Sequence, residues 1–216
     1  RNTTFMNVDA TCYYTKWGKG RSLNVSYNME LSAPSMTSLL NIRDDSNPLY
    51  ITLSNPNLKN ERRHTVHGDY RDKFGKTLFN VSFNANLTEN AEAWGYIYNK
   101  QTGVQTVTPE NVDGNWSMNV SPSVDFAIDK NDKWRVKQKA GYTHTNSVDL
   151  SGTDESVGAT KSVVVSNYVT EDLTLTWRPS DKLEFGTQGK LNYQHSGSDR
   201  ENFKAKIGRA SCRERV

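Results

Sequence analysis

The sequence has no hydrophobic run long enough to form a transmembrane helix, and its mean hydropathy is −0.78. A helix needs about 20 consecutive apolar residues to cross a bilayer. In a membrane-spanning β-barrel only alternate residues face the lipid, so the average hydropathy of such a chain stays low. This absence therefore argues against spanning helices and leaves a membrane barrel open.

Cysteine is scarce, because Cys12 and Cys212 are the only two in the chain. Cys212 lies in the last ten residues, Ile207 to Val216, which resemble a translated sequencing adaptor with the codons ATC GGA AGA GCG TCG TGT AGG GAA AGA GTG. We expect residues 207–216 to be a non-native tail and leave them out of the fold prediction. Only Cys12 then remains, which excludes an internal disulfide.

Since the chain begins at Arg1 without methionine or signal peptide, we expect a fragment cut at both ends.

An excess of one charge is also missing, since the net charge of +3 falls to +1 when the tail, with three arginines and one glutamate, is removed. No block of lysine and arginine resembles a phosphate-binding patch, so no nucleic-acid partner is predicted.

The sequence contains no Gly-x-Ser-x-Gly, phosphate-loop, His-Glu-x-x-His or Cys/His-cluster motif. His64 and His67 are close, but their spacing on a strand sends them to opposite faces. We expect no enzyme, no cofactor and no metal site.

Two-residue alternation is the strongest pattern present. Every second residue from Leu23 to Leu31 is apolar, and the residues between them are Asn, Ser or Glu. The same alternation, with more or less regularity, marks seven other stretches: 4–17, 65–74, 79–87, 116–128, 133–142, 161–177 and 183–194. This predicts an all-β fold, an antiparallel meander of about eight long amphipathic strands with one apolar and one polar face.

The connections between these stretches alternate in length. Short turns are expected near residues 19, 75, 131 and 180, and longer polar loops at 34–60, from 99–103 toward Gly114, and at 147–160. Outer-membrane barrels have short periplasmic turns and longer outer loops. Residues 1–206 are therefore predicted to be a partial transmembrane outer-membrane β-barrel domain. A soluble antiparallel sandwich is the alternative, but the long strands and the ordered connection lengths favour the barrel.

Aromatic residues gather at the predicted strand ends. Those beside the short turns are Trp17, Phe74, Trp134 and Trp177. Those expected nearer the other ends are Tyr27, Tyr70, Trp94, Tyr142 and Tyr193. Barrels carry such aromatic girdles at both membrane interfaces, so the pattern predicts one girdle at each end of the wall.

The first long loop carries a recognisable signature. Prolines follow Asn47 and Asn55, and because each proline disfavours helix at the residue before it, we expect an ordered, extended loop. Asn47-Pro48-Leu49 and Ser54-Asn55-Pro56-Asn57-Leu58-Lys59-Asn60-Glu61 resemble the signature "dP…GNPNLkPE" in barrel domains of TonB-dependent-receptor-like outer-membrane proteins, especially of Bacteroidota. Ser54 and Asn60 replace the usual Gly and Pro. The matching residues are Asn47, Pro48, Asn55, Pro56, Asn57, Leu58 and Glu61.

This resemblance implies a function in the bacterial cell outer membrane, in contact with its lipid. It implies a larger barrel of about 22 strands with a plugged lumen, uptake of an unknown small nutrient, and a TonB complex acting through a plug domain that this sequence lacks. A non-transporting surface barrel or adhesin is the first alternative, and a soluble β binding or structural protein is the second. Loops 35–60 and 147–160 are the expected recognition surface.

Overall fold

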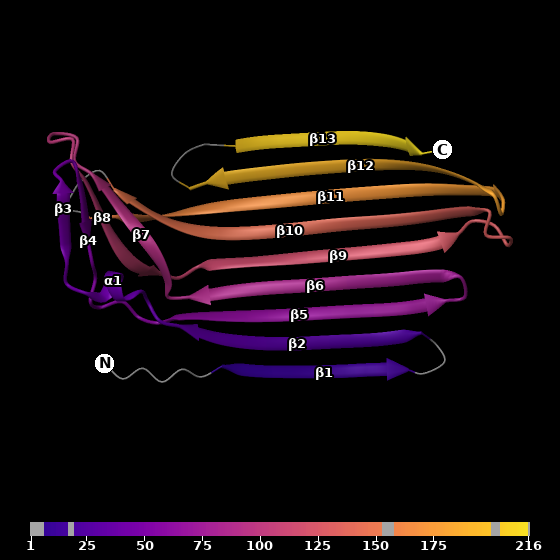
Figure 1. Cartoon of the computed structure of the whole chain (residues 1–216), viewed down its shortest axis with the longest axis horizontal. Coiled ribbons are helices and arrows are strands. Elements are labelled where there is room, and N and C mark those ends of the chain that lie inside the picture. Colours follow the sequence, from indigo (N-terminus) through magenta and orange to yellow (C-terminus); the bar gives the residue numbers. More distant parts are fainter. Residues whose placement is uncertain (1–6, 17–19, 153–157, 200–203, 216) are drawn as a thin grey trace.

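Long antiparallel strands dominate the computed structural model, which describes residues 7–16, 20–152, 158–199 and 204–215. Within them, nine strands form one up-and-down meander in which each strand pairs with the next (Figure 1). In order they are β1 (Val8–Lys16), β2 (Arg21–Ser32), β5 (Glu61–Phe74), β6 (Thr77–Glu89), β9 (Asn115–Ala127), β10 (Trp134–Gly152), β11 (Thr160–Ser180), β12 (Leu183–Ser198) and β13 (Lys204–Arg215). The first eight of these are the long strands that the alternation predicts.

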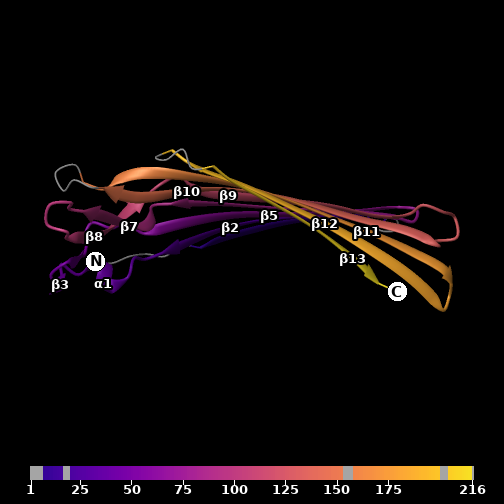
Figure 2. The same cartoon turned by 90° about the horizontal axis from the view of Figure 1, so that it is seen from above.

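The sheet is open and twisted, and its outer strands β1 and β13 lie at opposite edges (Figures 1 and 2). Short turns join the strands at one end, including Gly75, whose positive φ of 59° suits a residue without a Cβ. The predicted turn near residue 19 falls at 17–19, outside the described residues. The turns near 75, 131 and 180 are confirmed.

Four further strands lie at the other end, so the described strand count is thirteen rather than eight. They are β3 (Arg43–Asn47), β4 (Tyr50–Leu53), β7 (Ala91–Tyr98) and β8 (Gln105–Val112). They form two hairpins, which are joined by parallel pairing of β4 with β8. Strand β7 pairs in parallel with the end of β10, at Ser151 and Gly152. We call these four strands, with the helix α1 (Met36–Leu39), the hairpin extension.

The hairpin extension corrects the prediction of plain loops. Residues 34–60 contain a one-turn helix, whose N-cap Ser35 Oγ accepts a hydrogen bond from Ser38 N at 3.0 Å. Pro48 and Pro56 disfavour helix at the residues just before them, and α1 ends before both positions. Residues 105–112, expected in a loop, form β8, and β10 continues through 147–152. No helix among the described residues is long and apolar enough to cross a bilayer.

The register gives the meander two distinct faces. One cross-strand row contains hydroxyl and amide side chains only: Asn28, Thr65, Asn86, Ser117, Thr145, Ser166 and Ser196. A row of opposite parity consists of Val25, Gly68, Phe83, Val120, Tyr142, Val169 and Tyr193. Because alternate residues point to opposite sides of a strand, these rows define a polar face and an apolar face.

Among the residues whose burial the structure describes, the buried hydrophobic side chains do not lie in the middle of the meander. They are Leu58, Ala91, Val107, Val112, Val148 and Leu150, which belong to the hairpin extension or to the parts of the chain that adjoin it. On the apolar face of the meander, by contrast, Leu173 and Leu191 are 48% and 53% exposed. A single-layer sheet leaves both of its faces open, so no described segment of the chain covers this apolar surface.

The backbone of the expected tail continues the sheet. Strand β13 includes residues 204–215 and pairs antiparallel with β12. The adaptor-like origin of residues 207–216, and the division at residue 206, stay predictions.

Candidate functional site

The signature residues form a tight turn that locks the first long connection onto β8. Asn55 Oδ1 accepts a hydrogen bond from Asn57 N at 3.0 Å, which is the side-chain geometry that lets asparagine mimic a backbone turn. Asn55 Nδ2 donates to Pro109 O on β8 at 3.1 Å. Leu58 is fully buried. The Asn-Pro-Asn-Leu sequence therefore has a structural role as a clamp between two segments far apart in the chain.

Asn111, also on β8, completes this clamp, and sequence reasoning missed it. Its side chain bonds both backbone groups of Lys59, accepting from N at 2.7 Å and donating to O at 3.2 Å. The same amide also donates to Asn90 O at 2.8 Å. An asparagine in a stretch read as a loop carries no signal of its own, because its partners are backbone groups that only the fold brings near.

The other signature residues lie elsewhere. Asn47 is at the tip of the β3/β4 hairpin, where its Oδ1 accepts from Leu49 N at 3.1 Å, and Pro48 follows it. Glu61 begins β5 and forms an ion pair with Arg63 at 3.1 Å. The structure thus brings Asn55, Asn57 and Leu58 together with Pro56, and leaves the remaining three apart.

A small apolar core fixes the hairpin extension to the meander. Ala91 and Val112, from β7 and β8, pack with Val148 and Leu150 of β10. Ser38 Oγ of α1 donates to Glu92 Oε1 at 2.7 Å. The long connections are therefore anchored over one end of the wall, rather than projecting as separate loops.

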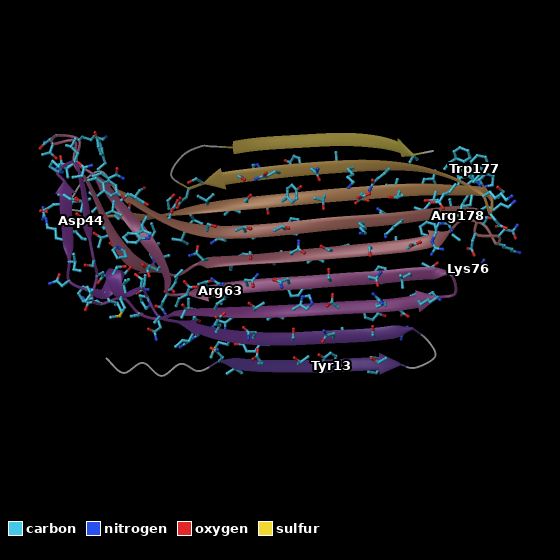
Figure 3. All side chains as sticks on the ribbon, in the orientation of Figure 1. Tyr13, Asp44, Arg63, Lys76, Trp177 and Arg178 are labelled. Atoms are coloured by element: carbon cyan, nitrogen blue, oxygen red, sulfur yellow. The ribbon has the colours of Figure 1, made fainter. Side chains whose placement is uncertain are left out.

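The far tip of the extension is polar. Asp44 lies there (Figure 3), and the hydroxyl and the backbone N–H of Ser46 both donate to its Oδ1. The Ser46 hydroxyl, followed by the Ser46 N–H, holds the pKa of Asp44 below its usual value. The carboxylate of Asp44 therefore remains ionised at neutral pH.

Half-exposed aromatic side chains follow alternate positions of β7. Trp94, Tyr96 and Tyr98 are 40%, 41% and 48% exposed. Tyr96 pairs with Ser151, which has the parity of the polar face on β10. The aromatic row therefore continues the polar side of the wall, and Trp94 belongs to the extension rather than to an aromatic girdle of the meander.

Aromatic rings also gather at the short-turn end. Trp134 stacks on Trp177 with ring centroids 5.3 Å apart, and Trp177 stacks on Phe185 at 5.4 Å. Phe74 lies at the same end and is 60% exposed. Trp17 is outside the described residues. The membrane girdle assigned to these four residues stays a prediction.

The aromatic residues expected at the opposite end of the wall lie at different positions along their strands. Tyr27 bonds His64 Nδ1 at 2.7 Å, toward the hairpin extension. Tyr142 and Tyr193 are in the same cross-strand row, on either side of Val169. Tyr70 is instead near the short-turn end of β5, where its hydroxyl donates to Asp72 at 2.8 Å.

Asp72 is a buried charge that the sequence reading overlooked. Its side chain is 2% exposed, yet it has the parity of the apolar residues Tyr70 and Phe74. Arg21 of β2 donates to Asp72 Oδ2 through both Nε and Nη2 at 2.7 Å. The sequence does carry a signal for this pair, because Asp72 occupies a position of the apolar row of its strand. A buried carboxylate at such a position requires a hydrogen-bonding or charged partner.

The two close histidines point to opposite faces, as their spacing predicts. His64 contacts Tyr27, on the apolar face, and His67 bonds Asp69 Oδ2 at 2.6 Å. Cys12 is free and exposed. Neither histidine meets the other, so this pair supplies no shared ligand position.

The family comparison agrees with this geometry. A family model described as "Outer membrane protein beta-barrel family" matches residues 13–208, which is most of the chain. No curated protein and no solved structure matches the chain. The match locates the chain in the bacterial outer membrane and rules out the soluble alternative. The chain belongs to the outer membrane protein β-barrel family, and its meander is barrel wall.

Proposed function

We propose that the chain forms part of the wall of an outer-membrane receptor or transporter that takes up nutrients, of the kind that TonB-dependent receptors represent. The observation that carries this proposal is the unbroken polar face. Its side chains are mainly neutral hydrogen-bonding groups, repeated across seven neighbouring strands. Such a surface suits a water-filled or plugged lumen, whereas the apolar face suits lipid.

Hydrogen bonds within this face keep the groups oriented. Asn119 Nδ2 donates to Thr143 Oγ1 at 2.8 Å, between β9 and β10. The hydroxyl groups of Ser166 and Ser196 are 2.9 Å apart, between β11 and β12. These groups keep further donor and acceptor positions for water or a polar solute.

The hairpin extension supports a receptor role. Binding sites combine aromatic side chains with a few polar groups, and the row Trp94, Tyr96 and Tyr98 offers such chemistry on the lumenal side. Short turns mark the periplasmic end of outer-membrane barrels, so the extension lies at the outer mouth. A solute arriving from outside would meet this surface first.

A non-transporting surface barrel or adhesin is the second candidate. It is favoured by the exposed apolar groups of the extension that do not line the wall, namely Met36, Ile42 and Leu49, which are 72%, 53% and 59% exposed. Exposed apolar groups at an outer surface are typical of contact with another molecule. Uptake and adhesion differ in whether the bound molecule enters the cell.

The test uses cells that express the full-length protein and cells that lack it. Both are given a labelled ferric siderophore, a labelled oligosaccharide and a labelled oligopeptide, with and without a protonophore. The proposal predicts accumulation of at least one probe, dependent on the protein and abolished by the protonophore, since a TonB complex acting through a plug domain would supply the energy. Surface binding without accumulation favours the adhesin.

A further inference from the structure

The polar face of the meander divides into a neutral part and a basic part. Three adjacent cross-strand rows, which begin at Asn28, Ser26 and Asn24 of β2, contain no lysine or arginine between β2 and β12 in the described register. Their one acidic residue, Asp69, is hydrogen-bonded to His67 at 2.6 Å. This part of the polar face therefore carries almost no net charge.

The next three rows, toward the short turns, are strongly basic. They begin at Ser22 of β2, Lys73 of β5 and Ala127 of β9. Their acidic residues are Asp125 and Asp172. Their six basic residues, which we call the basic band, are Arg71, Lys73, Arg135, Lys137, Lys139 and Lys190. Six positive charges against two negative ones leave an excess of four on this part of the wall.

Both carboxylates of the basic rows are already engaged. Asp125 Oδ1 accepts from Arg135 Nε at 2.6 Å, and Asp172 pairs with Lys190 at 3.3 Å. The amide of Gln188 also donates to both oxygens of Asp172, at 2.8 and 2.9 Å. The other members of the band are exposed and form no ion pair with another described residue: Arg71, Lys73, Lys137 and Lys139.

These four uncompensated groups form two pairs on the same face. Lys137 and Lys139 are two residues apart on β10, and Arg71 and Lys73 are two residues apart on β5, so each pair spans about 7 Å. Strands β6 and β9 separate the two pairs by three strand spacings, or about 14 Å. The floor between them offers hydrogen-bonding groups such as Asn80, whose Oδ1 accepts from Arg71 Nε at 3.0 Å.

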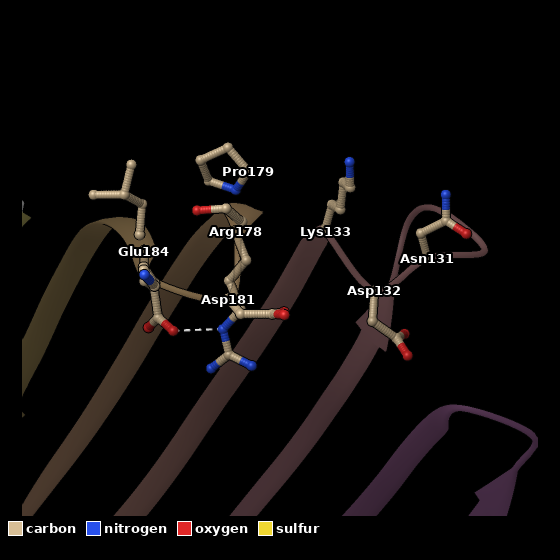
Figure 4. Close-up of a pocket in the computed structure, with 10 residues that line it drawn as sticks. Asn131, Asp132, Lys133, Arg178, Pro179, Asp181 and Glu184 are labelled. Atoms are coloured by element: carbon tan, nitrogen blue, oxygen red, sulfur yellow. Dashed lines mark hydrogen bonds and ion pairs between the residues drawn. The ribbon is translucent and has the colours of Figure 1, made fainter.

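The positive excess belongs to the wall and not to the turns beyond it. A groove of about 650 Å³ lies between the β9–β10 turn and the β11–β12 turn (Figure 4). Arg178 and Glu184 form an ion pair there, marked by the dashed line. The charged residues that line the groove are three basic and three acidic ones: Lys133, Arg178, Lys182, Asp132, Asp181 and Glu184. The charges of this turn surface therefore balance.

We propose that the basic band binds an anionic solute inside the barrel, one that carries carboxylate or phosphate groups. This inference rests on the proposed function, which makes the polar face the wall of the lumen. Rings of arginine and lysine line anion and phosphate pores, and a cleft lined by charges of one sign concentrates counter-ions. The two separated pairs suit a solute with more than one anionic group. The neutral rows lie on the outer side of the band, so the solute crosses them first.

The experiment measures the electrostatic potential at the band with two thiol reagents. Ser123, on β9, lies opposite Lys139 in a basic row. Ser117, on the same strand and the same face, lies in the neutral row that begins at Asn28. Ser123→Cys and Ser117→Cys are made separately in the full-length protein, with its native cysteines replaced, and purified in mild detergent. Each is labelled with anionic sulfonatoethyl methanethiosulfonate and with cationic trimethylammonioethyl methanethiosulfonate.

The ratio of anionic to cationic labelling rates is the readout, because the reactivity of the thiol itself cancels. It should be roughly tenfold higher at Ser123→Cys than at Ser117→Cys, since fixed charges of one sign raise the local concentration of counter-ions about tenfold or more. In the Ser123→Cys background, Lys137→Gln/Lys139→Gln should lower the ratio toward the Ser117→Cys value, and Lys137→Arg/Lys139→Arg should preserve it. Lys130→Gln/Lys182→Gln removes two exposed lysines from the turns, and as the matched control it should change little.

Protection then tests the class of solute. Citrate and pyrophosphate are added as probes at matched ionic strength, and glucose is the neutral control. At least one anion should slow labelling of Ser123→Cys, and glucose should not. Protection by citrate alone identifies a carboxylate solute, and protection by pyrophosphate alone a phosphate solute. Equal ratios at the two cysteines, a ratio unchanged in Lys137→Gln/Lys139→Gln, equal protection by glucose, or protection by neither anion would overturn the proposal.

Two further outcomes separate the band from the functions around it. If Ser117→Cys is labelled and Ser123→Cys reacts with neither reagent, protein covers the band and a solute is the wrong occupant. If neither cysteine is labelled, the polar face is not a wetted lumen, and the proposed function fails together with the band. Loss of the charge preference alone leaves the uptake assay to decide the proposed function. Heat-modifiable migration reports folding, and should the glutamine variant not fold, the comparison of the two cysteines and the protection by anions decide.

Discussion

Asn111 holds both backbone groups of Lys59, although the two residues are 52 positions apart in the sequence. Lys59 N donates to Asn111 Oδ1 at 2.7 Å, and Asn111 Nδ2 donates to Lys59 O at 3.2 Å. One side chain thus satisfies the donor and the acceptor of a segment that is not in a strand ladder. The signature turn depends on β8 for its position.

Asn111→Ala should therefore loosen the connection before β5. Lys59 is exposed, so water can replace the lost hydrogen bonds in part, and each is worth about 0.5–1.5 kcal/mol. The loss should stay local, because the barrel strands pair independently of this contact. Trypsin added to intact cells should cleave after Lys59 faster in the variant. Asn57→Ala is the matched control, because the Asn57 side chain is exposed and only its backbone N–H is used in the turn. Equal rates for the two variants would contradict the assignment.

The stability of the protein should depend on Arg21 and Asp72 being present together. Arg21→Ala leaves the buried Asp72 carboxylate without its ion-pair partner, and this destabilises more than removing both members of the pair. The urea midpoint of the reconstituted protein should therefore fall in Arg21→Ala and recover partly in Arg21→Ala/Asp72→Ala. Asp69→Ala, whose carboxylate is half exposed, is the control and should change little. A double variant no more stable than the single one would refute the pairing.

Asp129 makes the stability of the β9–β10 turn dependent on pH. Its Oδ1 accepts from Trp134 N at 2.8 Å, and this backbone donor is the main reason that the pKa of Asp129 lies below its ordinary value. A carboxyl whose pKa is lowered by folding stabilises the fold above its unfolded pKa, and loses that effect as the pH falls through the folded pKa.

The parent protein should then unfold at higher urea than Asp129→Asn at pH 7, and the difference should shrink as the pH falls below about 3.9, the ordinary pKa of an unfolded aspartate. Asp181→Asn, in the neighbouring turn, makes the same exchange where no backbone hydrogen bond to the carboxylate is found in the described structure. A difference that is constant with pH, or equally large for Asp181→Asn, would show that the turn does not depend on the Asp129 charge.

Trp177 should contribute more to barrel stability than an equally exposed tryptophan outside the meander. It stacks on both Trp134 and Phe185, and each aromatic pair adds about 0.5–1.5 kcal/mol. Trp177→Ala should lower the unfolding free energy in lipid vesicles by roughly 1–3 kcal/mol for the two stacks, before any lost burial. Trp94→Ala on β7 removes a side chain of similar exposure, 40% against 37%, and should leave the barrel transition unchanged.

The eight long strands were predictable because alternation such as Leu23 to Leu31 is visible without any tertiary context. The hairpins were not. Strand β3 is entirely polar and exposed, and Pro109 interrupts the alternation in β8, which is stabilised by the hydrogen bonds of Pro109 with Asn55 and of Asn111 with Lys59. The continuation of β10 through residues 147–152 could have been predicted, since Val148 and Leu150 alternate with polar residues there. The polar composition of the stretch 147–160 favoured a loop instead.

We infer that the apolar face of the meander meets lipid and that its polar face meets the lumen. The direct test places single cysteines at neighbouring positions of β9 and β6, in a full-length background in which the native cysteines are replaced. Val120→Cys and Phe83→Cys are paired across the strands, as are Asn119→Cys and Asn84→Cys one position away. Each carries a fluorophore, attached to the unfolded protein before insertion into vesicles.

We expect strong quenching of the Val120 and Phe83 fluorophores by brominated lipid, and quenching of the Asn119 and Asn84 fluorophores by aqueous iodide instead. Alternating accessibility of this kind is what a membrane-spanning strand requires. If all four positions respond alike, or if the pattern is reversed, the wall is not oriented as described and the receptor proposal loses its basis.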